Sequence, residues 1–267
     1  MTRLPTNREL GRAVEAAAAS DAVSVRRQRR WIAVSALIEV LHIAQQRKII
    51  QGFLVKGGFA LEFRFRGKAR ASRDVDIVLP IAAERILDAV VEVFRIGWSG
   101  FTFEIKGTPE LREHSYCLQV GAHYQKQDWS TFQLELVFAD IAGQDTLPPL
   151  DLSAYGLLTP TGIPCMTIAE QVAQKLHAVT DPAEDRPRDL IDIYLCVTRL
   201  PPNDDELREH CVRIFAERAT HAWPPVVEMR DGWPRQLTDI ITGSHLNLTP
   251  DEVFTGVRAL VERLAQA

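Results

Sequence analysis

The sequence lacks both long apolar runs and paired cysteines. No stretch of its 267 residues approaches the ~18 consecutive apolar residues that a membrane span needs, and the start, MTRLPTNRELGR, has no apolar core of a signal peptide. The four cysteines, at positions 117, 165, 196 and 211, show no C-x-x-C spacing and lie in apolar or amphipathic segments. These features predict a cytoplasmic protein with reduced, buried thiols and neither a disulfide framework nor a thiolate zinc site.

Low-complexity composition and a strong charge of one sign are also missing. Glycine and proline number 15 each, and 31 basic against 35 acidic residues give a net charge of −4. A hydrophobic fraction of 46% is enough for a real core, which excludes disordered and collagen-like chains. With this balance, any contact with a polyanion requires a local basic patch instead of the overall field.

Hydrophobic periodicity predicts a mixed α/β first half. The expected helices cover a small-residue run at 15–20, a long amphipathic segment at 25–49, the sequence FALEFRFR and 82–94, and the expected strands cover 53–55, 73–80, 101–106, 116–124 and 131–138. Four arginines, at positions 26, 27, 29 and 30, open the long helix. We interpret them as a solvated face, with a phosphate-contacting patch as the alternative.

The second half has helical signals. Thr167 to Glu170 and Thr249 to Glu252 both fit capping boxes, and 188–197 and 205–216 have helical spacing. The loop 147–164, rich in proline and glycine, is the best candidate boundary. We therefore expect an α/β domain with N-terminal helices at 1–150 and a helical domain at 151–267, which is an α+β (mixed α/β) fold.

The segment KGGFALEFRFRGKARASRDVDIVLP contains the most chemical information. Side chains at i and i+2 of a strand emerge on one face about 6.5–7 Å apart, so Asp74 and Asp76 can point at one site and share a divalent cation such as Mg²⁺. Gly57 and Gly58, at a strand-to-helix junction, let the backbone approach a phosphate at the helix N-terminus. Either signal alone is common in ordinary turns. Together they match the needs of metal-assisted phosphoryl or nucleotidyl transfer.

This order of motifs resembles the polymerase-β-like nucleotidyltransferases, and in detail the AbiEii/AbiGii toxin family, which includes the MenT toxins. A second segment, TIAEQVAQKLHAVTDPAEDRPRDLIDIYLCV, is similar to the later motif of that family, and the two segments cover about a quarter of the chain. The resemblance implies a nucleotidyltransferase-like mixed sheet with flanking helices and a helical C-terminal half that completes the nucleotide site.

The resemblance also implies roles for individual residues. Lys56, Gly57, Gly58 and Lys175 would bind the triphosphate. Asp74 and Asp76 would bind Mg²⁺, and either Asp189 or Asp192 would complete the later motif. The family usually has threonine or serine after the second glycine, where this chain has Phe59. That departure removes a hydroxyl from the expected phosphate site.

The residues of the second segment also allow simpler interpretations. Lys175 lies in a polar helical stripe, where it suits a triphosphate or forms an exposed pair with Gln171. Asp189 also suits a helix cap. Arg186 and Arg188 either clamp phosphate or neutralise neighbouring carboxylates.

A third carboxylate is common in the superfamily, where it helps to activate the attacking hydroxyl. Glu135 on the last expected strand of the first half is the favoured candidate, with Asp140 just past the strand end and Glu104 as substitutes. A solvent-facing strand position is the competing interpretation of Glu135. The histidines His42 and His177 are interpreted as packed or surface residues, not ligands.

The resemblance therefore implies a toxin of a toxin–antitoxin system that transfers a nucleoside monophosphate from an NTP to an RNA acceptor, the 3′ end of tRNA. A plausible polyanion patch consists of Arg64, Arg66, Lys68, Arg70 and Arg73. A cognate antitoxin is an implied partner. Two alternatives are transfer to a small hydroxylated molecule and a catalytically silent nucleotide-binding module.

Overall fold

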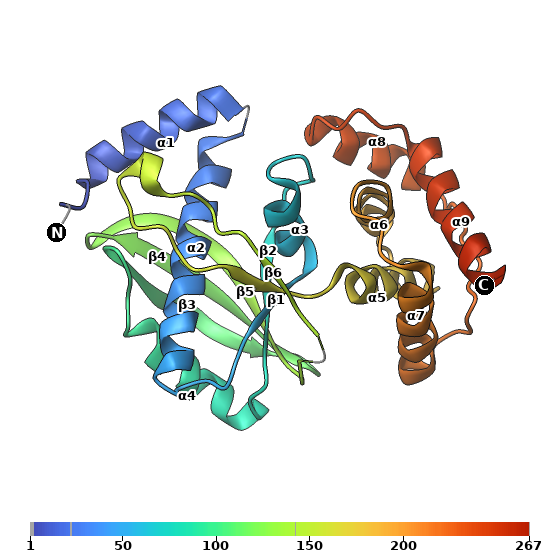
Figure 1. Ribbon diagram of the computed structural model, residues 1–267, viewed down its shortest axis with the longest axis horizontal. Helices are drawn as coiled ribbons and strands as arrows, with labels where there is room; N and C mark the ends of the chain where they lie inside the picture. Colours follow the sequence, from blue (N-terminus) through green and yellow to red (C-terminus); the bar gives the residue numbers. More distant parts are fainter. Residues whose placement is uncertain (1–2, 22, 142, 267) are drawn as a thin grey trace. The chain divides into compact units, whose positions relative to one another are not determined.

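In a computed structural model, which describes residues 3–21, 23–141 and 143–266, the apolar pattern after Ser24 forms one long helix, α2 (Val25–Gln46). The side chain of Ser24 caps it by accepting a hydrogen bond from the Arg27 backbone N–H at 3.3 Å. Most of the helix is buried because it crosses one face of a β-sheet (Figure 1). The predicted helix is thus confirmed, with its end three residues earlier than the pattern suggested.

The chain divides into two units. The sheet unit comprises Met1–Arg64 and Ser72–Cys165, and the helical unit comprises Phe65–Ala71 and Met166–Ala267. The main division therefore falls after Cys165, whereas the sequence placed a boundary near residue 150. The segment 65–71 interrupts the sheet unit because it packs in the helical unit, where Arg199 Nη1 donates to the Lys68 carbonyl at 2.7 Å.

The sheet unit contains a mixed seven-stranded sheet with the order β3-β4-β5-β2-β1-β7-β6. Its strands are β1 (Leu54–Lys56), β2 (Asp74–Leu79), β3 (Phe101–Leu111), β4 (Ser115–Tyr124), β5 (Gln127–Phe138), β6 (Asp145–Leu147) and β7 (Ile163–Cys165). Its helices are α1 (Asn7–Asp21), α2, α3 (Gly57–Phe65), α4 (Ala83–Phe94) and the short 3₁₀ turn η1 (Ser153–Tyr155). The predicted mixed α/β character is confirmed.

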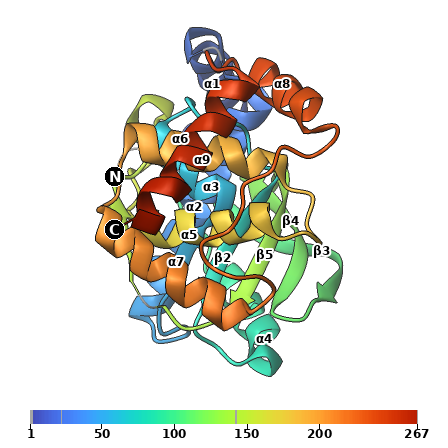
Figure 2. The ribbon, with the colours of Figure 1, turned by 90° about the vertical axis from the view of Figure 1, so that its right-hand side faces the viewer.

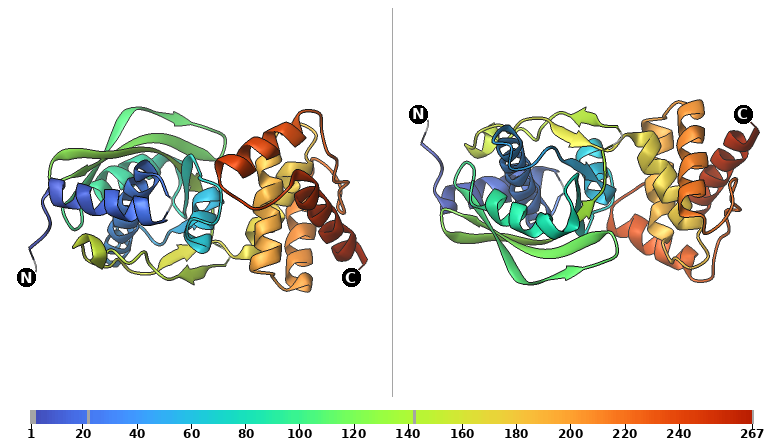
Figure 3. Two further views of the ribbon diagram at one scale, coloured as in Figure 1. Left: turned by 90° about the horizontal axis from the view of Figure 1, so that it is seen from above. Right: turned by 90° about the horizontal axis from the view of Figure 1, so that it is seen from below.

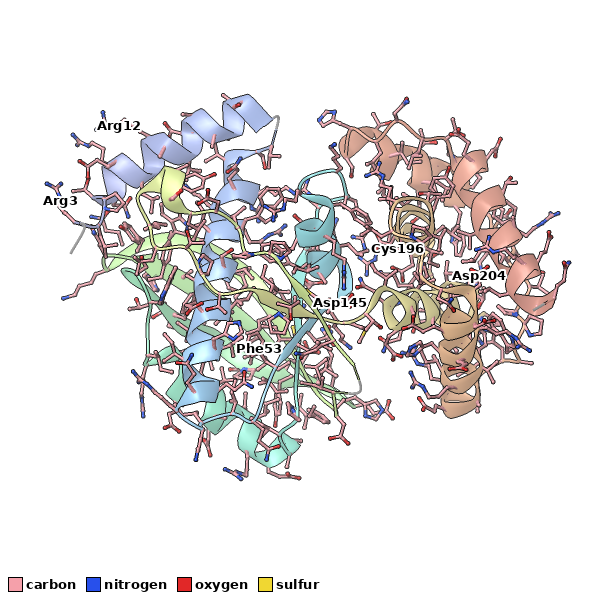
Figure 4. All side chains as sticks on the ribbon, viewed as in Figure 1. Arg3, Arg12, Phe53, Asp145, Cys196 and Asp204 are labelled. Carbon is pink, nitrogen blue, oxygen red and sulfur yellow. The ribbon has the colours of Figure 1, made fainter. Side chains whose placement is uncertain are left out.

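The core of the sheet unit lies on one face of the sheet. Strand alternation buries Val75 and Ile77 of β2 and Leu134 and Leu136 of β5, and the strands β3 to β5 curve around α2 on that side (Figure 3). Phe53, labelled in Figure 4, is 2% exposed beside this core. The residues between these apolar positions consequently point to the opposite face, and it is these residues that build the candidate site.

The helical unit contains the helices α5 (Ile168–Thr180), α6 (Pro187–Arg199), α7 (Asp204–Arg218), α8 (Trp233–Gly243) and α9 (Pro250–Gln266) (Figure 2). Both predicted capping boxes mark helix starts: Thr167 Oγ1 accepts from the Glu170 N–H, and Thr249 and Glu252 cap each other.

Cys196 lies inside this unit (Figure 4). All four cysteines are free thiols, three of them buried and Cys117 half-buried. No helix in the described part of the chain is both long and apolar enough to cross a membrane.

The Thr249 cap gives a first testable prediction. Thr249→Ala removes both the acceptor for the Glu252 N–H and the donor to the Glu252 carboxylate, 2.8 Å away. We expect the unfolding free energy to fall by about 1 kcal/mol, measured by chemical denaturation. Thr238→Ala is the control, because that hydroxyl only donates back to the Pro234 carbonyl within α8. Equal stabilities of the two variants would count against the cap.

The interpretation of the arginine cluster as a solvated face is wrong for two of its members. Arg27 Nε and Arg30 Nη2 contact Glu62 of α3 at 2.8 and 3.0 Å, and the Glu62 side chain is completely buried. Arg29 stacks over the ring of Trp129 at 4.9 Å, and Arg26 is exposed. The arginines and Glu62 are at least 32 residues apart in the sequence, so the periodicity of the helix alone does not reveal these ion pairs.

Candidate active site

Strand register gathers the predicted carboxylates on one face of the sheet. β2 runs parallel to β5 with Asp76 opposite Glu135, and antiparallel to β1 with Asp76 opposite Lys56. Residues paired in register share a face, so Lys56, Asp76 and Glu135 form one row across three strands. Asp74, two residues before Asp76, lies on the same face. All four side chains are half-buried, as expected for the rim of a binding site.

The glycine corner lies directly against Asp76. Helix α3 begins at Gly57, whose φ of +68° belongs to the left-handed region. A Cβ added to Gly57 would overlap the carboxylate of Asp76. The first backbone N–H groups of α3 and the Asp76 carboxylate are therefore neighbours, so groups suited to bind a phosphate adjoin a group suited to bind a cation.

The corner yields a second prediction, for Gly57→Ala. The added methyl group strains a left-handed backbone by roughly 1–2 kcal/mol and pushes the Asp76 side chain away. We expect a loss of nucleotidyl transfer that exceeds the loss of stability, measured by transfer assays beside thermal melting. Gly243→Ala is the matched control because a Cβ there meets no atom within 4 Å. Full activity of Gly57→Ala would show that Asp76 is not held as described.

Among the three candidates for the third carboxylate, register favours Glu135. Asp140 lies beyond the end of β5 and is exposed. Glu104 lies on β3, which β4 and β5 separate from β2. Glu135 Oε1 accepts a hydrogen bond from Ser115 Oγ at 2.7 Å, which orients the carboxylate. Ser115 was not identified from the sequence, because only the pairing of β4 with β5 places it beside Glu135.

Phe59 has a structural explanation. Its side chain is fully buried and packs edge-on against Phe63, with ring centroids 4.9 Å apart. The position thus faces the core of the sheet unit, where a phosphate has no access. The backbone of Gly57 and Gly58 forms the start of α3.

In the helical unit, the second segment forms a buried charge cluster. Lys175 Nζ of α5 contacts Asp189 Oδ1 at 2.6 Å and Asp192 Oδ2 at 2.8 Å, both on α6. Arg70 Nη2 contacts Asp192 Oδ2 at 2.5 Å, so the cluster holds two cations and two anions. Lys175 is therefore not in the exposed pair with Gln171 that the sequence allowed. Asp189 lies in the first turn of α6, as its interpretation as a helix-start carboxylate required, and it also pairs with Lys175.

Burial and pairing act in opposite directions within this cluster. Burial alone lowers the pKa of Lys175, but the nearby Asp189 and Asp192 carboxylates more than offset it and raise the pKa. For Asp192, burial raises the pKa, but the charges and hydrogen bonds of Arg70 and Lys175 lower it by more. The net shift of the Asp192 pKa is therefore downward. Both shifts favour the charged forms, so the pairs stabilise the unit between the ordinary pKa values of aspartate and lysine.

The remaining basic candidates fall into two groups. Arg186 Nε pairs with Glu184 at 2.7 Å, and Arg64 Nη2 pairs with Asp145 of β6 at 2.7 Å. Arg66, Lys68, Arg73 and Arg188 are exposed. Arg73 immediately precedes Asp74 in the sequence.

The donor set of the sheet unit fits a hard divalent cation. Asp74, Asp76 and Glu135 present carboxylates side by side on one face, where like charges repel unless a cation lies between them. Oxygen donors of this kind suit Mg²⁺, which usually binds through one or two carboxylates together with substrate phosphates. The arrangement is chemically suited to hold a metal–triphosphate complex at the start of α3.

Comparison with known proteins identifies the family of the chain. The sequence matches the family described as nucleotidyl transferase AbiEii toxin, type IV toxin–antitoxin system, over residues 43–259. No curated protein matches the chain. Among solved structures, MenT4, a nucleotidyltransferase toxin from Mycobacterium tuberculosis H37Rv, shares the fold with a TM-score of 0.59 and 19% identity, covering 98% of both chains.

A further similar structure is that of JHP933 from Helicobacter pylori, with a TM-score of 0.48, 16% identity and coverage of 86% of this chain and 88% of the other. The family match extends over most of the sequence and includes both segments that carry the motifs. The chain therefore belongs to the AbiEii family of nucleotidyltransferase toxins of type IV toxin–antitoxin systems.

Proposed function

We propose that the protein transfers a nucleoside monophosphate from an NTP to the 3′ end of tRNA, with Mg²⁺ held by Asp74 and Asp76. The observation that carries the proposal is the contact of the Asp76 carboxylate with the Gly57 corner at the start of α3. It brings anionic metal ligands next to the N–H groups that bind phosphate, which is the arrangement that nucleotidyl transfer needs.

Each group of the sheet unit has a defined task in this proposal. The N–H groups at the start of α3 bind phosphate oxygens, and the absence of a side chain at Gly57 lets the Asp76 carboxylate lie against this corner. Asp74 and Asp76 hold the cation, and Glu135, oriented by Ser115, accepts the proton of the attacking hydroxyl or joins the cation ligands. The bound Mg²⁺ supplies charge neutralisation for the α-phosphate and the departing pyrophosphate.

The role of Lys175 as a phosphate partner is kept as part of the proposal. Its ammonium already contacts two carboxylates, so substitution by alanine would remove the counter-charge that Asp189 and Asp192 share, leaving the longer Arg186 contact to Asp189 and the Arg70 contact to Asp192. Loss of activity in Lys175→Ala would thus mix lost chemistry with lost stability. Variants of the sheet carboxylates give the cleaner test.

Two classes of acceptor molecule are compatible with the proposed reaction. Arg73, the residue before Asp74 in the sequence, is an exposed cation, and exposed cations are the groups that bind a nucleic-acid backbone. A small hydroxylated acceptor is the second candidate, and the net charge of −4 is compatible with it. As a member of a toxin family, the protein is proposed to have a cognate antitoxin, whose coexpression would relieve toxicity.

Incubation of the purified protein with total tRNA, Mg²⁺ and each labelled NTP in turn tests the proposal. We expect label in RNA, and loss of labelling with a chelator or in Asp76→Asn. Label that enters only small molecules supplied as acceptors would replace tRNA in the proposal. A silent module would label nothing, and its triphosphate binding would be the same in wild type and Asp76→Asn.

A further inference from the structure

Three side chains that the proposed reaction does not use converge at the end of α5. The donor atoms of His177, Asp181 and His221 all lie within 4.8 Å of one another. His177 and Asp181 are four residues apart, so the last turn of α5 places them on one side. After α7 the chain reverses at Ala219, which has a left-handed φ of 53°, and this turn brings His221 to the same point. The cluster lies entirely within the helical unit.

The hydroxyl of Thr220 marks the point of convergence. Its Oγ1 lies 3.1 Å from His177 Nε2, 2.7 Å from Asp181 Oδ2 and 3.0 Å from His221 Nδ1. A hydroxyl has one proton and therefore donates to only one of these atoms, for which the Asp181 carboxylate is the strongest acceptor. Thr220 is exposed, so rotation of its side chain can withdraw the hydroxyl.

A neighbouring threonine fixes the orientation of the His221 lone pair. Thr180 Oγ1 donates to the Leu176 carbonyl at 2.8 Å and lies 2.8 Å from His221 Nε2. Because its proton is used on the carbonyl, Thr180 accepts the Nε2–H of a neutral His221 ring, and Nδ1 is left as a lone pair facing the cluster. The cluster then offers the lone pairs of His221 and Asp181 to one hydroxyl proton. An excess of lone pairs over protons favours a cation.

The chemistry of the donors selects the kind of cation. Two imidazole nitrogens and one carboxylate oxygen suit zinc and similar divalent transition metals, whereas the all-oxygen row on the sheet suits Mg²⁺. His177 and Asp181 are 3% and 8% exposed, so an ion bound there is largely shielded from water. Asp181 Oδ1 accepts the Ala183 N–H at 2.9 Å, and outer contacts of this kind hold metal ligands in place. We propose that His177, Asp181 and His221 bind one divalent transition-metal ion, with zinc as the expected occupant.

Arg218 makes the proposal unusually testable. Its Nη1 lies 3.4 Å from His177 Nδ1, where it donates weakly. Ligation through Nε2 requires Nδ1 to carry the ring proton, and two donors cannot face each other. Metal binding must therefore open the Arg218 contact, and Arg218→Gln should bind the metal more tightly than wild type. A purely structural hydrogen-bond cluster predicts no such gain.

The test uses the full-length, chelator-treated protein with ZnCl₂ or CoCl₂ in excess Mg²⁺, followed by calorimetry and visible absorption of bound cobalt. We expect one ion per chain, with affinity at least about 10-fold weaker in His221→Ala. His245→Ala is the control because His245 is an exposed histidine of the same unit. His221 is only half-buried, so its replacement is better tolerated than that of His177.

Several outcomes would overturn the inference. These are absence of saturable zinc binding to wild type, equal binding by His221→Ala and His245→Ala, and binding that disappears in Asp76→Asn. The last variant also separates this inference from the proposed reaction. It should keep the zinc site while it loses nucleotidyl transfer, so either proposal can fail without the other.

Discussion

Asp76→Asn is expected to lower nucleotidyl transfer on the order of 10³-fold or more while the protein stays folded. The substitution keeps the shape of the side chain beside Gly57 but removes the negative charge that we propose holds the cation. It also relieves repulsion with Asp74 and Glu135, so its unfolding temperature should stay close to that of wild type. Initial rates of label incorporation, measured beside thermal melting, check both parts of this prediction.

Asp140→Asn is the matched control for this experiment. Asp140 is an exposed aspartate just past the end of β5, outside the row of carboxylates. Its variant should transfer at the wild-type rate. A result in which both variants lose activity equally, or neither does, would place the metal site elsewhere in the chain.

Glu62→Ala is expected to destabilise the sheet unit by roughly 3–5 kcal/mol, because it leaves buried cations without a counter-charge. The Glu62 carboxylate is fully buried and accepts from Arg27 Nε at 2.8 Å, Arg30 Nη2 at 3.0 Å and Trp31 Nε1 at 2.7 Å. It also accepts from the backbone N–H of Ser72, just ahead of β2. One carboxylate thus ties α2 to α3 and to the strand that carries the aspartates.

Chemical denaturation of Glu62→Ala and Glu92→Ala measures this effect. Glu92 is an exposed residue of α4, and its replacement should change the unfolding free energy by less than about 0.5 kcal/mol. Glu62→Gln retains hydrogen-bond acceptance and should lie between the two. If Glu62→Ala proves as stable as the Glu92 control, the buried network does not hold α2, α3 and β2 together.

Local sequence pattern was sufficient for the part of the site that lies on consecutive elements. The period of two in β2 put Asp74 and Asp76 on one face, and the glycine pair located the start of α3. Both follow from short-range backbone geometry, which the sequence encodes directly. The capping boxes at Thr167 and Thr249 succeeded for the same reason.

Long-range pairing was beyond the reach of these patterns. β6 and β7 have three residues each, too few for any periodicity, and they lie at the two ends of the segment 147–164 that was expected to be a loop. Helix α8 was also missed. The sequence already favoured Glu135, but its position opposite Asp76 comes only from strand register, and the burial of Glu62 comes from the contact of α2 with α3. In each case the deciding partner is distant in sequence.

Crystallisation with Mn²⁺ and a non-hydrolysable NTP tests the central claim most directly, because the anomalous signal of the ion locates it without reference to activity. We expect an ion bound by Asp74 and Asp76, with the phosphates at the N-terminus of α3 beside Gly57. An ion or a triphosphate bound away from those aspartates would contradict it.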